Sequence, residues 1–161
     1  FVMARLRALT ATSGEAWSDV GHVAVLDIDN FKYINDRFGH ATGDAVLKNF
    51  AVTLQRLVRK TDILGRVGGE EFILILPHTS LAEAEAVIDQ MLAAVRRSRP
   101  LPQEVSFRYT FSAGLAGARQ GDDPDEVYRR ADLALYAAKM RGRDQIAIDL
   151  PASPRLTQDP G

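Results

Sequence analysis

Apolar and polar positions along the chain switch between the periods typical of strands and of helices. The stretch "HVAVLDID" at 22–29 is apolar until its end, which predicts a buried strand that ends in two aspartates. The following "NFKYINDRFGH" at 30–40 is short and interrupted, so we expect one or two helical turns and then a Gly-His corner. From Thr42 to about Arg59, apolar residues recur at helical spacing and predict a longer helix.

A glycine pair divides the next apolar stretch. "ILGRV" at 63–67 precedes Gly68 and Gly69, and "EEFILILP" at 70–77 follows them. Two runs of strand-forming residues around such a pair predict a β-hairpin, and Pro77 ends its second strand.

The second half of the chain predicts two more helices and two more strands. "SLAE" at 80–83 is a capping box, so a helix begins there. "SFRYTFSAGLAG" at 106–117 alternates as a strand does, and "QIAIDL" at 145–150 is a short closing strand. "DPDE" at 123–126 combines a cap, a first-turn proline and a glutamate, and it begins a last helix that we expect to end near Met140.

The predicted order of elements is β-α-α-β-β-α-β-α-β. A central hairpin with crossover helices indicates an α/β fold of the α+β sandwich type, with a mixed, mostly antiparallel sheet flanked by helices. We expect residues 1–150 to form one domain and the proline-rich tail, residues 151–161, to be disordered. In this sheet the end of the first strand at Asp27 and the glycine pair lie on neighbouring strands, so they can meet.

Composition excludes several kinds of chemistry. The 161 residues include no cysteine, which removes disulfides, thiolate metal sites and cysteine nucleophiles. The net charge of −1 gives no global field that would attract DNA, RNA or an anionic membrane, so any phosphate binding must be local. The chain opens at Phe1 with no recognisable signal peptide or membrane span, so we expect a cytoplasmic fragment, whose parent protein a membrane could still anchor.

Four carboxylates gather at one edge of the predicted sheet. Two end the first strand and two begin the second strand of the hairpin: Asp27, Asp29, Glu70 and Glu71. Like charges in one place repel one another, and a divalent cation relieves the repulsion; an all-oxygen ligand set favours Mg²⁺ or Mn²⁺ over zinc. Two such ions can clamp the attacking and leaving oxygens of a phosphoryl transfer. The alternative is that these acids are solvated strand ends or pair with Arg66 and Lys32.

Several motifs occur together in one order. They are "DIDNFKYINDRFGHATGD" at 27–44, "RVGGEEF" at 66–72, "TFSAG" at 110–114 and "ADLALYAAKMRGRD" at 131–144. In this order and spacing they resemble the GGDEF domain, the catalytic domain of diguanylate cyclases, over about residues 20–148. The signature loop is "GGEEF" here, a variant that the family also uses. Neither a P-loop nor a G-x-G-x-x-G motif is present, so the usual nucleotide-binding folds have no support.

The resemblance implies a reaction and its setting. Two GTP molecules, each held by one domain of a two-fold homodimer, condense into cyclic di-GMP with release of two pyrophosphates. The resemblance also implies a palm-like domain related to adenylate cyclases, with two Mg²⁺ or Mn²⁺ ions per active site. It implies no DNA or RNA partner, and it places a regulatory domain N-terminal to this one in the parent protein.

Metal-binding and catalytic residues follow from the same resemblance. Asp27 and Glu70 correspond to the metal-binding carboxylates, with the carbonyl of Ile28 as a further ligand. Asp27, Glu70 and Glu71 form the catalytic set. Two roles stay open for Glu71, which are metal binding and deprotonation of the attacking ribose 3′-hydroxyl.

A second group of residues corresponds to the GTP-binding positions of the family: Phe31, Lys32, Asn35, Asp44, Gly68, Gly69, Lys139 and Arg143. Asn35 and Asp44 would recognise the guanine edge, because Asp44 accepts from its N–H donors and Asn35 both donates and accepts. The backbone N–H groups of the turn at 31–32 would face the phosphates, as would the cations of Lys139 and Arg143, which we expect one helical turn apart. The glycine pair gives the ribose and triphosphate room to approach. Taken singly, these residues could also be helix caps and a solvated helix end.

The stretch "RKTD" at 59–62 resembles the family's product-inhibition site for cyclic di-GMP. Arg59 can bind a phosphate or a guanine edge, Asp62 can accept from guanine donors, and Arg66 adds a contact. The alternative is a helix-end arginine with a capping aspartate. The family often completes this site with a second arginine, and that position holds Gln90 here, which argues against tight cross-linked inhibition.

Three other functions stay open at this point. They are a cyclic di-GMP or GTP receptor that has lost catalysis, a palm-type enzyme acting on other nucleotides, and a purely structural dimerisation module. The intact "GGEEF" argues against the first, and the guanine-matching Asn35 and Asp44 argue against the second. The usual N-terminal "D-x-L-T-G-L-x-N-R" segment of the family is absent. Because two domains must face each other for the reaction, we expect the isolated domain without its dimerising N-terminal region to bind nucleotide and to turn over slowly.

Overall fold

A computed structural model describes residue 4 and residues 21–149. Its elements follow in the order β1 (Gly21–Ile28), α2 (Phe31–Phe38), α3 (His40–Gln55), β2 (Ile63–Gly68), β3 (Glu71–Pro77), α4 (Leu81–Arg97), β4 (Phe111–Ala118), α5 (Pro124–Met140) and β5 (Ile146–Asp149). The predicted order of strands and helices is confirmed. The tail at 151–161 lies outside the described residues. No helix in the described part of the chain is long and apolar enough to cross a membrane.

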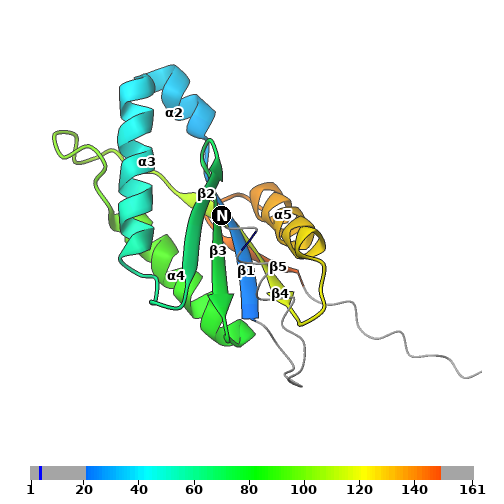
Figure 1. Cartoon of the computed structure of the whole chain (residues 1–161). Helices are drawn as coiled ribbons and strands as arrows, with labels where there is room; N and C mark the ends of the chain where they lie inside the picture. Colours follow the sequence, from blue (N-terminus) through cyan, green and yellow to red (C-terminus); the bar gives the residue numbers. More distant parts are fainter. Residues whose placement is uncertain (1–3, 5–20, 150–161) are drawn as a thin grey trace, which may run out of the picture.

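Five strands form one sheet in the order β2-β3-β1-β4-β5. The central strand β1 is antiparallel to both β3 and β4, and β2 is antiparallel to β3, whereas β5 pairs with β4 in parallel. The sheet is therefore mixed and mostly antiparallel, as predicted. Helix α5 covers one face of it, and α2, α3 and α4 lie on the other side (Figure 1).

Side chains of β1 alternate between the two faces of the sheet. Leu26 packs in the core cluster shared with α3 and α4, and Val25 packs in the cluster under α5. This burial on both faces explains the unbroken apolar run of the strand. Because side chains alternate with a period of two, Asp27 faces α5. Ile73 of β3 also belongs to the α5 cluster, so Glu71 faces the same helix.

Helix α3 is shorter than predicted at its C-terminal end. It ends at Gln55, so Arg59 lies in the turn before β2 instead of on the helix. Leu57 and Val58 continue the apolar pattern beyond the helix because they still pack against the core from that turn. The apolar pattern therefore predicts a helix that extends beyond the observed end of α3 at Gln55.

Strand β4 begins at Phe111, later than the predicted start at residue 106. The aromatic residues before it turn toward the helices instead of pairing in the sheet. The ring of Phe107 packs edge-on against Phe38 of α2, with 5.3 Å between the centroids. The hydroxyl of Tyr109 donates to Asn49 Oδ1 of α3 at 2.6 Å. The alternation that suggested a strand here reflects this anchoring to helices.

Helix α5 packs closely on β4 because Gly114 has no side chain. A Cβ at this position would lie 2.0 Å from the carbonyl oxygen of Ala131 and 2.2 Å from the backbone nitrogen of Leu135. This contact fixes how near α5 lies to the sheet. It thereby sets the positions of the polar side chains that α5 turns toward the end of β1.

Candidate functional site

The end of β1 meets the turn of the β2–β3 hairpin, as predicted. In the β1–β3 ladder Asp27 is the partner of Glu71, and the Ile28 N–H donates to the Glu70 carbonyl at 3.4 Å. The turn consists of Gly69 and Glu70, and the φ of 51° at Gly69 lies in the region that favours glycine. Three predicted catalytic carboxylates therefore share one edge of the sheet.

The Asp27 carboxylate is buried at the end of β1 and is bonded to α5. Lys139 Nζ donates to Asp27 Oδ2 at 3.0 Å. Burial raises the pKa of Asp27 to about 6, the hydrogen bond and charge of Lys139 act in the opposite direction, and the charges of Glu70 and Glu71 add to the rise. The lysine thus offsets only part of the cost of negative charge at this edge. A further cation is favoured there.

Arg66 and Lys32, which were the alternative partners for the acids, have other environments. Arg66 Nε donates to the Gly69 carbonyl at 2.7 Å and so closes the hairpin tip. Lys32 is exposed on α2. Within residues 21–149 neither forms an ion pair with the four carboxylates. The pairing alternative is therefore wrong, and the cation comes from α5.

Glu71 has a hydrogen-bond partner that sequence reasoning missed. The Tyr128 hydroxyl of α5 donates to Glu71 Oε1 at 2.5 Å. Burial and then the hydrogen bond to Glu71 raise the pKa of the Tyr128 phenol, so it keeps its proton as a donor. A tyrosine next to the core residue Val127 on a predicted helix signals a hydroxyl that needs a partner. The identity of that partner depends on the tertiary structure.

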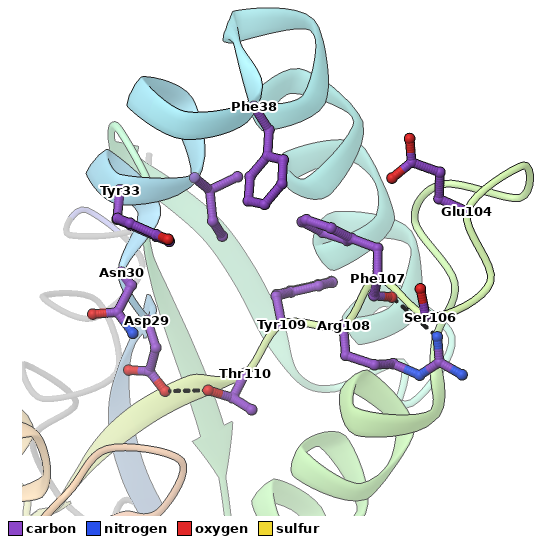
Figure 2. Close-up of a pocket in the computed structure, with 11 residues that line it drawn as sticks. Asp29, Asn30, Tyr33, Phe38, Glu104, Ser106, Phe107, Arg108, Tyr109 and Thr110 are labelled. Atoms are coloured by element: carbon purple, nitrogen blue, oxygen red, sulfur yellow. Dashed lines mark hydrogen bonds between the residues drawn. The ribbon is translucent and has the colours of Figure 1, made fainter.

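Asp29, the fourth predicted carboxylate, is used by the fold itself. Its Oδ1 accepts from the Ser112 hydroxyl at 2.6 Å. Its Oδ2 accepts from the Thr110 hydroxyl at 2.7 Å, as Figure 2 shows, and from the Asp144 backbone N–H at 3.0 Å. These bonds join β1 to β4 and to the connection between α5 and β5. Asp29 is therefore structural, and three carboxylates remain at the site.

The predicted phosphate-facing turn is the first turn of α2. Asn30 precedes it in the left-handed region, with a φ of 56° and no side-chain cap. Phe31 is half-buried against the core, and Lys32 is exposed. The N–H groups in the first turn of a helix lack intrahelical partners and carry partial positive charge. This turn follows directly on the β1 end that carries Asp27.

Asn35 and Asp44, the predicted guanine-reading pair, lie on the two helices that the turn between α2 and α3 connects. Gly39 makes that turn with a φ of 93°, and its N–H donates to the Asn35 carbonyl at 2.8 Å. The Asn35 amide lies on the backbone of α3, where a Cβ at Gly43 would come within 1.8 Å of Asn35 Oδ1. Asp44 is the next residue and is exposed. Neither α2 nor α3 has a side-chain cap, so the alternative of helix caps is wrong.

Lys139 and Arg143 do not lie one helical turn apart on a helix, which corrects the prediction. Helix α5 ends before Arg143, whose φ of 64° is left-handed. The Arg143 N–H donates to the Ala138 carbonyl at 3.0 Å and closes the helix end. Arg143 is exposed beyond this turn, whereas Lys139 is held by Asp27.

Arg59 and Asp62 form a compact pair in the turn between α3 and β2. Arg59 Nη2 and Nε donate to Asp62 Oδ1 at 2.8 and 3.1 Å, and the Arg59 backbone N–H donates to Oδ2 at 2.8 Å. The hydrogen bond to Asp62 raises the pKa of Arg59. The Asp62 side chain is 0% exposed and that of Arg59 is 43% exposed. Asp62 can therefore meet a ligand only if the pair opens, and Arg66 contacts the hairpin tip instead.

A pocket of about 530 Å³ opens between α2 and the segment before β4. Its walls are largely aromatic: Tyr33 lies on one side in Figure 2, and Phe38, Phe107 and Tyr109 lie on the other. Of the four predicted carboxylates only Asp29 lines it, and none of the residues predicted to bind metal, GTP or cyclic di-GMP does. It adjoins a different face of α2 from Asn35, so we do not assign it to guanine.

The oxygen atoms at the carboxylate edge suit a hard divalent cation as ligands. Asp27 and Glu70 offer carboxylate oxygens and Ile28 a backbone carbonyl, which are the ligand types that Mg²⁺ and Mn²⁺ prefer. Among the described residues, no three His, Cys, Asp or Glu side chains converge into a ready-made metal site. This is compatible with Mg²⁺, which uses one or two protein carboxylates and completes its shell with water and phosphate oxygens.

Comparisons with known proteins identify the family of this chain. The sequence profile described as "Diguanylate cyclase, GGDEF domain" matches residues 5–145, and the chain therefore belongs to the GGDEF-domain family. The chain is 41% identical over 126 residues to the diguanylate cyclase DgcP of Pseudomonas aeruginosa, with 78% of this chain and 19% of that protein covered. It thus spans about a fifth of that relative.

Solved structures of the family share the fold. The active GGEEF domain of a diguanylate cyclase from Vibrio cholerae matches with a TM-score of 0.74 at 37% identity, over 81% of this chain and 83% of that one. The GGDEF domain of DgcB from Caulobacter crescentus, solved in complex with c-di-GMP, matches with a TM-score of 0.74 at 34% identity, over 80% and 77% of the two chains. The predicted fold class and family resemblance are confirmed.

Proposed function

We propose that this domain is the catalytic unit of a diguanylate cyclase, which joins two GTP molecules into cyclic di-GMP and releases two pyrophosphates. The observation that carries the proposal is the β1–β3 register, because it places Asp27 opposite Glu71 with Glu70 beside it. The similarity to named diguanylate cyclases supports the same reaction. The relative solved with c-di-GMP supports the dinucleotide as a ligand.

The carboxylate edge is assigned to metal binding. Asp27 and Glu70 would hold Mg²⁺ or Mn²⁺ together with the Ile28 carbonyl, with two ions per active site. When bound, these cations neutralise the charge that develops on the transferred phosphate. Lys139 favours the ionised form of Asp27, because it lowers a pKa that burial raises.

Substrate recognition is assigned to α2, α3 and the chain beyond α5. The Asn35 amide and the Asp44 carboxylate present the donors and acceptors that a guanine edge requires. The turn at 31–32, the ammonium of Lys139 and the exposed guanidinium of Arg143 bind the triphosphate. The glycines at 68 and 69 leave space beside the hairpin, since a Cβ at either would meet nothing within 4 Å.

Glu71 is assigned to the attacking ribose 3′-hydroxyl. Within residues 21–149 its carboxylate makes one hydrogen bond, which Oε1 accepts from Tyr128. Oε2 can therefore accept a proton or a hydrogen bond from the hydroxyl. Tyr128 fixes the orientation of that carboxylate.

Each domain holds one GTP, so two copies must face each other about a two-fold axis for the reaction to proceed. Cyclic di-GMP would then inhibit by binding at Arg59 and Asp62. Because the Asp62 side chain is covered by its pair with Arg59, the dinucleotide must open that pair before Asp62 can contact guanine.

An assay with two nucleotides tests the reaction. The chain is fused to a dimerising coiled coil and incubated with Mg²⁺ and either GTP or ATP, and the products are identified by mass spectrometry. We expect cyclic di-GMP and pyrophosphate from GTP and no cyclic dinucleotide from ATP, because Asn35 and Asp44 match guanine. A dimer that binds cyclic di-GMP and makes none would replace this proposal with the receptor alternative.

A further inference from the structure

A second pocket, of about 410 Å³, lies between the C-terminal ends of α3 and α4. The polar residues that line it belong to the last turns of the two helices and the residues that follow: Asn49, Thr53, Arg56, Arg97, Ser98 and Arg99. Helices α3 and α4 lie across the sheet from α5 (Figure 1). The pocket shares no residue with the carboxylate edge or with the Arg59–Asp62 pair.

Three guanidinium groups line this α3–α4 pocket, and no carboxylate does. Arg56, Arg97 and Arg99 are exposed and make no ion pair within residues 21–149. The neighbouring Arg96 differs, because its Nε lies 2.8 Å from Asp144 Oδ1. The fold therefore neutralises Arg96 and leaves the three positive charges at the pocket without an acidic partner in the described chain.

The negative ends of the two helix dipoles offset part of this positive charge. The C-terminal end of each helix carries roughly half a negative charge, which favours arginine there. Together the ends of α3 and α4 offset about one of the three positive charges, so a surplus of about two remains. An anion in a concave site can contact several of these cations at once.

A buried tyrosine orients a neutral donor at the same pocket. Tyr109 is 4% exposed, and its hydroxyl donates to Asn49 Oδ1 at 2.6 Å. This bond fixes which end of the Asn49 amide is the oxygen, so its Nδ2 group remains a donor on the other side. Oriented N–H donors beside guanidinium groups are the arrangement that phosphate oxygens prefer.

We propose that the α3–α4 pocket binds a small molecule that carries a diphosphate or polyphosphate group. Guanidinium groups make paired hydrogen bonds to phosphate oxygens, and such a group carries enough negative charge to match the surplus. Free pyrophosphate and the phosphate tail of a nucleotide present the same chemistry. The pocket is separate from the residues assigned to catalysis and inhibition, so binding here does not require turnover.

Titration calorimetry of the full chain with sodium pyrophosphate in EDTA tests this proposal. EDTA removes divalent cations, so metal-dependent binding at Asp27 and Glu70 does not contribute. We expect saturable binding that weakens at least about tenfold in the double variant Arg97→Gln/Arg99→Gln, because charge-assisted hydrogen bonds are lost. The double variant Lys48→Gln/Lys60→Gln removes the same charge at exposed positions outside the pocket and should bind as wild type does.

Two further measurements keep the outcome decisive. Arg56→Gln gives a single-site variant if the double variant does not fold, and amide NMR shifts at Asn49 and Thr53 report whether the pocket is occupied. A parallel titration with GDP, followed at Asn49 and Thr53 so that guanine binding at Asn35 and Asp44 does not contribute, distinguishes the sources. Equal or tighter binding of GDP at the pocket indicates a nucleotide tail, and tighter binding of pyrophosphate indicates the free diphosphate. No saturable binding, equal loss in the control variant, or shifts confined to the carboxylate edge would overturn the proposal.

Discussion

Lys139 Nζ lies 3.0 Å from Asp27 Oδ2, and this contact joins the last helix to the end of the first strand. Lys139 compensates only part of the cost of burying negative charge at this site. The pKa of Asp27 stays raised at about 6, because burial raises it more than Lys139 lowers it. The negative charges of Glu70 and Glu71 raise it further. The edge therefore holds unfavourable negative charge in the absence of a bound cation, as binding sites often do at some cost in stability.

The raised pKa of Asp27 predicts that removing its charge stabilises the metal-free domain. The folded state binds the proton more tightly than the unfolded chain, whose carboxyl has the ordinary value of 3.8. The stabilisation from that proton is complete below pH 3.8 and is lost as the pH rises through about 6. In EDTA at about pH 8, Asp27→Asn should therefore raise Tm by several degrees, and the gain should shrink toward about pH 4.

Asp29→Asn is the control for this measurement, with the opposite expected sign. The Asp29 carboxylate accepts hydrogen bonds from Thr110, Ser112 and Asp144, and an amide cannot accept all of them. Its Tm should fall at both pH values. If Asp27→Asn also melts below wild type at about pH 8, the ionised Asp27 carboxylate does not destabilise the metal-free domain, and the prediction is wrong.

The meeting of Asp27 with the hairpin was predictable because it depends on local rules. The period of two along a strand and the glycine turn of the hairpin determine which side chains share a face and an edge. The same rules failed where tertiary contacts decide: the alternating residues before β4 anchor to helices, as Tyr109 does to Asn49.

The contacts of α5 could not be read from the sequence. The Tyr128–Glu71 and Lys139–Asp27 bonds join residues 57 and 112 positions apart in the chain. They exist because Gly114 lets α5 lie close to the sheet. Periodicity predicts which side of α5 faces inward, but it does not specify which acid each polar side chain reaches.

Tyr128→Phe tests whether the phenol positions Glu71. The substitution keeps the ring and removes the donor, so Glu71 loses its fixed orientation. We expect kcat for cyclic di-GMP synthesis by the dimerised chain to fall about tenfold, with the KM for GTP nearly unchanged. Tyr136→Phe is the matched control, since Tyr136 lies on the same helix and is 62% exposed. An equal loss in both variants, or a change in KM alone, would argue against a positioning role.

Gly43→Ala tests the guanine-binding assignment through packing. The added Cβ would overlap Asn35 Oδ1 and displace the amide from its place on the backbone of α3. GTP affinity with Mg²⁺, measured by calorimetry, should fall at least about tenfold, because a buried recognition bond is lost. Asn35→Ala should show a similar loss, and the two together should be non-additive. Ala41→Ser, an exposed change on α3, should leave GTP binding intact, and wild-type affinity in Gly43→Ala would refute the assignment.

Arg59→Ala tests the pair at the proposed inhibitory site. It leaves the buried Asp62 carboxylate without its charged partner, a loss that costs about 3 kcal/mol in a dry interior and less here because Arg59 is partly exposed. Thermal unfolding should show a Tm several degrees lower. Arg59→Ala/Asp62→Ala should recover part of that loss, because no unpaired charge remains. A double variant less stable than the single one would contradict this view of the pair.

The central claim is that the edge formed by Asp27, Glu70 and Glu71 synthesises cyclic di-GMP, and Glu70→Ala tests it most directly. Synthesis from GTP and Mg²⁺ is compared among dimerised wild type, Glu70→Ala and Asp89→Ala, which removes an exposed acid from α4. We predict equal rates for wild type and Asp89→Ala. Glu70→Ala should lose at least about a thousandfold in rate while still binding cyclic di-GMP. Undiminished synthesis by Glu70→Ala, or none by wild type, would contradict the account.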